Sequence, residues 1–85
     1  MSQIKLLPQE VQGDSKFTGQ LVMTCGFKAA FGEAAVIAMI TLLRIINERV
    51  KGDGADYLQK AEYKGVRYWI IDDGEVVTVL LPSEY

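Results

Sequence analysis

Three carboxylates, Asp72, Asp73 and Glu75, lie close together near the C-terminal end of the chain. Such a cluster could serve acid–base chemistry or hold a hard cation, since Mg²⁺ and Ca²⁺ prefer oxygen ligands. The three residues surround an Asp-Gly pair, however, and aspartate is favoured beside a tight turn for backbone reasons alone. Their spacing also matches no EF-hand loop. The pattern therefore favours turn chemistry over a catalytic or metal site.

The remaining residues offer little further chemistry. The chain has no histidine, which removes the usual base at neutral pH, His-activated nucleophiles and most transition-metal sites. No glycine-rich phosphate-binding motif occurs. The single cysteine, Cys25, is expected to be a small buried residue inside a strand. The sequence therefore predicts a protein that is not an enzyme and that uses no cofactor and no metal.

Two turn signals, Lys64-Gly65 and Asp73-Gly74, separate runs rich in β-branched and aromatic residues. Asp-Gly between two such runs is a strong hairpin signal. The pattern predicts a three-stranded meander over residues 57–81. Two-residue turns would set the register by placing Tyr63 opposite Val66, Glu62 opposite Arg67 and Ile71 opposite Val76.

Alternation along these strands sorts their side chains into two faces. The face expected to pack on a helix consists of Tyr57, Gln59, Ala61, Tyr63, Val66, Tyr68, Ile70, Val77, Val79 and Leu81. The other, which we call the outer sheet face, consists of Leu58, Lys60, Glu62, Arg67, Trp69, Ile71, Val76, Thr78 and Leu80. Trp and Arg are preferred anchors of protein interfaces. We therefore expect Trp69 to anchor a binding site, flanked by Lys60, Glu62, Arg67 and Thr78.

The rest of the chain is expected to supply one long helix and one further strand. Residues 1–16 are expected to form an arm or short strand, residues 17–27 a strand, and residues 29–51 a helix that Gly52 ends. From Ala34 to Ile40 this helix is apolar on every side, which predicts burial on every side. One small sheet covers only one side of a helix. Either the N-terminal segment or a second copy is therefore expected to cover the other.

Together these elements predict one α+β domain over residues 1–85, with two layers: one long helix packed on an antiparallel sheet. A net charge of −2 without a concentrated basic patch makes nucleic acid an unlikely partner. The longest apolar run, residues 34–40, is far shorter than the roughly 20 residues that cross a bilayer. No signal peptide opens the chain. We expect a cytoplasmic protein that does not bind membranes and forms a homodimer.

Several segments, taken in order, resemble one family: Met23-Thr24-Cys25-Gly26-Phe27, the helix that follows, Asp56-Tyr57-Leu58-Gln59, and Pro82-Ser83-Glu84-Tyr85. They are similar to an uncharacterised family of short proteins, domain of unknown function number 960, found in phages and mobile elements of Gram-positive bacteria. The resemblance covers residues 21–85, although the family has Arg where this chain has Cys25. It implies a short accessory protein of a phage or mobile element, and it carries over no activity.

Two functions remain open. One is a binding module that docks on a host protein through the outer sheet face. The alternative is sequestration of a small nucleotide or single-stranded nucleic acid, in which Trp69 stacks a base while Lys60 and Arg67 hold phosphates. A third possibility is purely structural, namely that residues 1–16 or a second copy cover this face.

Overall fold

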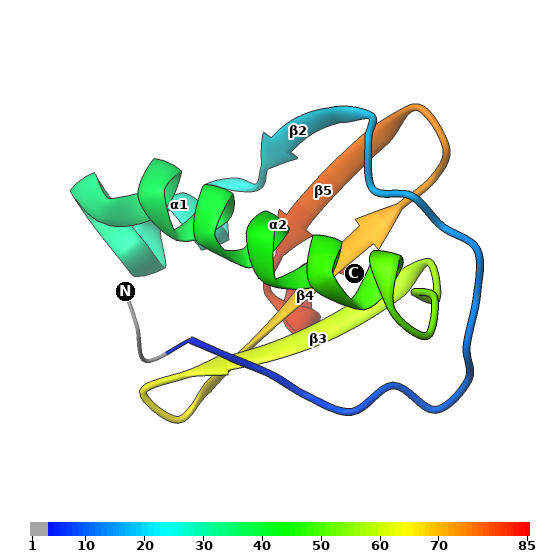
Figure 1. Ribbon diagram of the computed structural model, residues 1–85. Coiled ribbons are helices and arrows are strands. Elements are labelled where there is room, and N and C mark those ends of the chain that lie inside the picture. Colours follow the sequence, from blue (N-terminus) through cyan, green and yellow to red (C-terminus); the bar gives the residue numbers. More distant parts are fainter. Residues whose placement is uncertain (1–3) are drawn as a thin grey trace.

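The computed structural model describes residues 4–85 and places a helical layer on one face of a five-stranded sheet (Figure 1). The strands are β1 (Lys5–Leu6), β2 (Gln20–Met23), β3 (Leu58–Tyr63), β4 (Val66–Asp72) and β5 (Val76–Leu80). Their order across the sheet is β1-β3-β4-β5-β2. The helices are α1 (Cys25–Phe31) and α2 (Ala35–Lys51), joined by the 3₁₀ turn η1 (Gly32–Ala34), and a second 3₁₀ turn, η2 (Pro82–Glu84), follows β5. The predicted α+β class with two layers is confirmed.

The first hairpin of the meander has the predicted register. Tyr63 lies opposite Val66, and the two residues between them form the turn. Glu62 lies opposite Arg67 in the next pair away from the turn. Lys64 has a φ of 52° and Gly65 a φ of 80°. A type I′ turn needs a positive φ at both central residues, and here both residues meet that requirement.

The second hairpin differs from the prediction of a two-residue turn at Asp73-Gly74. Ile71 lies opposite Thr78 rather than Val76. The Asp72 and Asp73 side chains accept hydrogen bonds of 2.8 to 3.0 Å from backbone N–H groups of the loop, which stabilises a longer connection. The register therefore shifts by two residues. Because side chains alternate with a period of two, every strand residue keeps its predicted face.

The predicted strand over residues 17–27 is wrong at both ends. Phe17 is 1% exposed and has a φ of 53°, a left-handed conformation that cannot continue a strand. At the other end Thr24 caps α1, since its side chain accepts a hydrogen bond of 3.2 Å from the N–H of Phe27. The helical region thus begins at Cys25 rather than residue 29, and the Cys25 side chain is exposed rather than buried.

The sheet is mixed rather than antiparallel, because β2 pairs in parallel with β5. The helical layer carries the chain from β2 back across the sheet, so that β3 starts at the same end as β2. A crossover helix is the usual link between strands that run in the same direction. The expected single helix is also interrupted at Gly32, which has a φ of 59°.

The core lies between the helical layer and the predicted inner face of the meander. Five of its strand residues are buried apolar side chains: Ala61, Tyr68, Ile70, Val77 and Val79. They pack with Phe27 of α1 and with one stripe of α2 formed by Ala35, Ala38, Leu42 and Ile46. Tyr57 was also expected on this face, but it precedes β3 and is 50% exposed.

A buried hydrogen-bond network fixes the N-terminal arm to the core. Gln59 is 1% exposed, and its Oε1 accepts a hydrogen bond of 2.6 Å from Nη1 of Arg49 on α2. Its Nε2 donates to Oε1 of Gln9 at 2.8 Å and to the carbonyl of Asp56 at 2.9 Å. No buried side-chain nitrogen or oxygen within residues 4–85 lacks a partner. The arm, expected as an arm or short strand, thus contributes strand β1 at one edge of the sheet and then passes around the end of the sheet to β2 at the other edge (Figure 1).

Candidate functional site

Strands β3, β4 and β5 bring all five predicted site residues onto the outer sheet face. Lys60 lies opposite Trp69 and Glu62 opposite Arg67 across β3 and β4. Thr78 lies opposite Ile71 across β4 and β5, two residue pairs further along β4 than Trp69. The residues come together because strand alternation puts them on one side and the β3–β4 turn fixes their register.

The ion pair on this face is exposed and weak. Nε of Arg67 lies 3.2 Å from Oε1 of Glu62, with 60% and 38% of the two side chains exposed. Lys5 of β1 lies opposite Glu62 on the other side, so one carboxylate stands between two basic residues. Pairs as exposed as this contribute about 0–1 kcal/mol to stability. These side chains therefore remain available to a partner at little cost to the fold.

Trp69 is half-buried at the centre of the face. The Lys60 Nζ lies 5.6 Å from the centroid of its ring, within the range of a cation–π contact. The ring of Tyr85 meets it edge-on, with centroids 5.4 Å apart and planes at 62°. Its cross-strand neighbour Leu80 is only 5% exposed, whereas Tyr85 is 75% exposed. The centre of the face is thus aromatic and apolar, and its rim carries charge.

The segment after β5, rather than residues 4–16, covers part of Trp69. Glu84 fixes this segment, because its carboxylate accepts hydrogen bonds from the Thr24 hydroxyl at 2.6 Å and from the N–H groups of Gly26 and Leu81, both at 3.0 Å. These bonds, that of Thr24 foremost, lower the pKa of Glu84 from its usual 4.5. The carboxylate also lies at the N-terminus of α1, where negative charge is favourable. No local sequence pattern signals this contact between residues about 60 positions apart.

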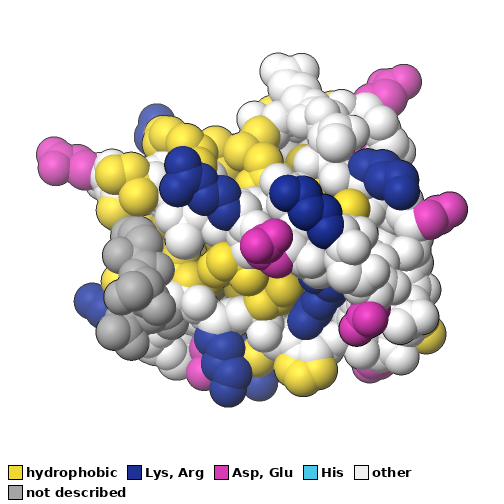
Figure 2. All heavy atoms as spheres, viewed as in Figure 1, with side chains coloured by type: hydrophobic (Ala, Val, Ile, Leu, Met, Phe, Trp, Pro, Cys, Tyr) yellow, Lys and Arg dark blue, Asp and Glu magenta, His cyan; other side chains and the backbone are white. Residues whose placement is uncertain are grey.

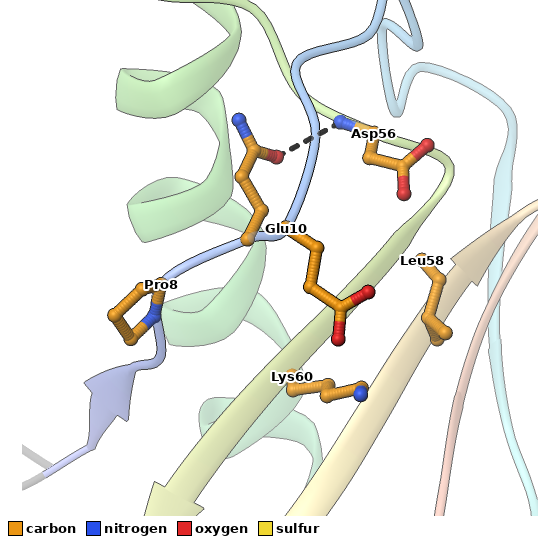
Figure 3. Close-up of a pocket in the computed structure, with 6 residues that line it drawn as sticks. Pro8, Glu10, Asp56, Leu58 and Lys60 are labelled. Carbon is orange, nitrogen blue, oxygen red and sulfur yellow. Dashed lines mark hydrogen bonds between the residues drawn. The ribbon is translucent and has the colours of Figure 1, made fainter.

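A small hollow opens where the arm borders the outer sheet face (Figure 3). It measures about 100 Å³ and is lined by Pro8, Gln9, Glu10, Asp56, Leu58 and Lys60. The Glu10 carboxylate and the Lys60 ammonium group extend toward one another across it (Figure 3). Ligand pockets usually measure about 300–1,000 Å³, so this hollow does not enclose a nucleotide. Within residues 4–85 no group of three or more Cys, Asp or Glu side chains is arranged to hold a metal ion.

A second surface, on the helical layer, was not expected to be open. Val36, Ile37 and Ile40 of α2 are 55%, 60% and 42% exposed, so the expectation of burial on every side is wrong. Figure 2 views this layer from outside and shows hydrophobic side chains lying open among charged ones. After β1, the N-terminal arm passes around one end of the sheet to β2 and does not run over the outer side of α2 (Figure 1). Among residues 4–85, no segment covers Val36, Ile37 and Ile40 of α2.

By length and composition alone, the stretch Cys25–Lys51 is also apolar enough to cross a membrane, and only 28% of its most apolar window is buried. The core helix of a globular protein passes the same test. Here Ala38 and Ile46 are fully buried against the sheet, and the 3₁₀ turn η1 interrupts the stretch. One stripe of this stretch thus packs on the sheet as a core helix does, while Val36, Ile37 and Ile40 remain exposed on the other side.

No family model, no curated protein and no solved structure matches this chain. The interpretation of the candidate site therefore rests on the geometry of its residues alone. The resemblance to the phage and mobile-element proteins stays a sequence-based prediction.

Proposed function

We propose that the protein is a small non-enzymatic binding module that docks on another protein through the outer sheet face. The observation that supports this most is the aromatic pair of Trp69 and Tyr85, with Lys60 and the Glu62–Arg67 ion pair beside it. An aromatic centre that a partner desolvates on binding, surrounded by a charged rim, is the usual anatomy of a protein interface. Trp, Tyr and Arg are also the residues that most often dominate binding energy.

The partner that we propose is a protein of a Gram-positive bacterial host. The resemblance to accessory proteins of phages and mobile elements supports this choice. The mixed charges of the face, with Lys60 and Arg67 beside Glu62, favour a partner surface that also carries both signs.

Sequestration of a nucleotide or of single-stranded nucleic acid remains the second candidate, because Lys60 and Trp69 lie side by side. Three features make it weaker. The ammonium group of Lys60 already stands over the indole ring, Arg67 is paired with Glu62, and the neighbouring hollow measures only about 100 Å³. Calorimetric titration with a nucleotide panel and a short oligonucleotide separates the two functions, since saturable heat would favour this second one.

The test of the proposal uses the most exposed members of the face. Trp69→Ala is a poor probe by itself, because it would uncover Leu80 and weaken the fold. The double variant Arg67→Ala/Tyr85→Ala removes two exposed side chains and should leave the melting temperature within a few degrees. Val11→Ala/Lys16→Ala, on the exposed loop before β2, is the matched control.

Proteins captured from a Gram-positive lysate by the wild-type chain are quantified against both variants, and the partner so found is then purified for titration. The outer-face double variant should bind at least about tenfold more weakly, as expected when an interface anchor is truncated. The control should bind like wild type. Equal binding by all three proteins would place the recognition surface elsewhere on the molecule.

A further inference from the structure

The exposed face of α2 has the spacing of a helix-pairing seam. Ile37, Ile40, Arg44, Asn47 and Lys51 follow one another at intervals of three and four residues, which keeps them on one stripe of the helix. Val36 borders the stripe beside Ile37 and Ile40. All three are 42–60% exposed, whereas the opposite stripe of α2 packs on the sheet. The apolar part of the seam thus points away from the core of its own chain.

Two opposite charges flank this apolar part symmetrically. Glu33, in the 3₁₀ turn η1 that leads into α2, precedes Ile37 by four residues, and Arg44 of α2 follows Ile40 by four residues. Both side chains are exposed. Within residues 4–85 the one ion pair joins Arg67 and Glu62, so neither Glu33 nor Arg44 has a partner of opposite charge there. Along the chain, the order is an acidic residue, two apolar residues and a basic residue. When two copies of this segment lie antiparallel, the acidic residue of each copy therefore faces the basic residue of the other.

We propose that α2 pairs with α2 of a second copy of this chain in antiparallel orientation about a two-fold axis. The axis passes beside the midpoint of Ala38 and Met39, which places Ile37 opposite the partner's Ile40. Glu33 then lies opposite the partner's Arg44, and the two-fold axis repeats this ion pair. A parallel arrangement would instead bring Glu33 to Glu33 and Arg44 to Arg44, which like-charge repulsion disfavours.

The area available makes this a weak dimer. A standard interface buries about 800 Å² per partner, which is about one-seventh of the 5259 Å² surface of the chain. Val36, Ile37 and Ile40 supply only part of this buried area. The helical turns around them, which carry the charged residues, therefore belong to the interface as well. Affinity depends on the quality of the anchors rather than on area, and three exposed aliphatic side chains per copy are expected to give a dissociation constant on the order of micromolar.

This inference is independent of the proposed function, because the seam and the outer sheet face lie on opposite layers of the fold. In the antiparallel dimer both outer sheet faces remain open. The assembly would therefore present two recognition surfaces, and a partner with two sites would be held by avidity.

Charge exchange tests both the contact and its direction. Sedimentation equilibrium of the full chain, from about 1 µM to about 1 mM, measures the dimer constant of wild type, Glu33→Arg, Arg44→Glu and the double exchange. Each single exchange replaces two attractions by two repulsions and should weaken the dimer roughly tenfold or more, while the double exchange should restore it. Glu75→Arg and Lys16→Glu are matched controls at exposed positions outside the seam. Ile37→Glu should give a folded monomer, which circular dichroism checks, because Ile37 is 60% exposed and the core does not need it.

A chain that stays monomeric throughout this range would overturn the proposal. So would a dimer that Ile37→Glu leaves intact. A dimer that Ile37→Glu breaks but that the double exchange fails to rescue would exclude the antiparallel register. Flotation with phosphatidylcholine vesicles tests the competing occupant of the seam, since monomeric protein that binds vesicles through Ile37 would assign this face to a membrane surface.

Discussion

Gln59→Leu tests whether the buried hydrogen-bond network stabilises the fold. Leucine has nearly the shape of glutamine but removes three hydrogen bonds: one from Arg49 at 2.6 Å, one to Gln9 at 2.8 Å and one to the Asp56 carbonyl at 2.9 Å. Two of the former partners keep another bond. Nη1 of Arg49 still reaches the Leu7 carbonyl at 3.0 Å, and Oε1 of Gln9 still accepts from the N–H of Asp56 at 3.0 Å.

The magnitude follows from these bonds. A hydrogen bond to a charged group contributes about 1.5–3 kcal/mol and a neutral one about 1 kcal/mol, but the remaining bonds and the more apolar leucine offset part of the loss. We expect Gln59→Leu to lower the free energy of unfolding by about 2–3 kcal/mol. A chain of 85 residues has a total of about 4–13 kcal/mol, so the loss is a large fraction of it.

Urea denaturation followed by circular dichroism measures this change. With an m-value of about 1 kcal/mol/M, typical of the smallest domains, the midpoint should fall by about 2–3 M. Gln20→Leu, at an exposed position of β2, is the matched control and should change stability by less than about 0.5 kcal/mol. If Gln59→Leu is as stable as the control, an apolar side chain replaces the network without loss, as happens with some buried polar groups.

Two further predictions concern the β4–β5 loop and the C-terminal segment. Gly74→Val should cost about 1–2 kcal/mol in urea denaturation, because the φ of Gly74 is 101° although a Cβ there would meet no atom within 4 Å. Glu75→Val, at the next residue, which is also exposed and whose φ is not positive, is the control. An unchanged stability of Gly74→Val would contradict the loop conformation. Glu84→Gln should be less stable than wild type near neutral pH, with a difference that shrinks as the pH falls below about 4.5. The pKa of Glu84 is lowered from 4.5 in the folded chain, so its contribution is present above that value and is lost as the carboxylate becomes protonated. A difference between wild type and Glu84→Gln that does not vary with pH would refute this role.

The meander could be predicted from the sequence because its determinants are local. Alternation fixed the two faces, and Lys64-Gly65 fixed the pairing of Glu62 with Arg67. The second turn differs from the prediction, and so does Tyr57, which precedes β3 and is 50% exposed. Asp72 and Asp73 bond to loop N–H groups instead of allowing a two-residue turn, and Asp73 avoids the positive φ that a type I′ turn would require.

The errors in the first half of the chain come from contacts that are distant in sequence. Phe17 is held in its left-handed conformation while its N–H donates to Oδ2 of Asp72 at 3.0 Å, and the N-terminus of α1 is capped by Glu84. Neither partner is visible in a local window. Gly26 and the absence of an acidic residue in the first turn made a helix start at Cys25 unattractive, yet the missing negative charge arrives from the other end of the chain.

The sequence predicted which residues share the outer sheet face, but it did not predict that Tyr85 packs against Trp69 there. All five residues lie on the outer sheet face, while the contribution of Tyr85 depends on how the C-terminal segment folds back.

That segment physically connects the two layers of the molecule. Glu84 binds Thr24 and Gly26 at the start of the helical layer, and the next residue, Tyr85, packs on Trp69 on the opposite side of the sheet. The position of Tyr85, the most exposed aromatic residue of the proposed recognition surface, therefore depends on a hydrogen-bonded carboxylate that lies outside that surface. Because Glu84 has no contact with Lys60 or Arg67 among these hydrogen bonds, its loss would free Tyr85 and leave the charged rim in place. If a partner needs Tyr85 held against Trp69, loss of the Glu84 carboxylate would weaken both partner binding and the cap of α1. If a partner contacts only the charged rim, loss of this carboxylate would leave its binding unchanged.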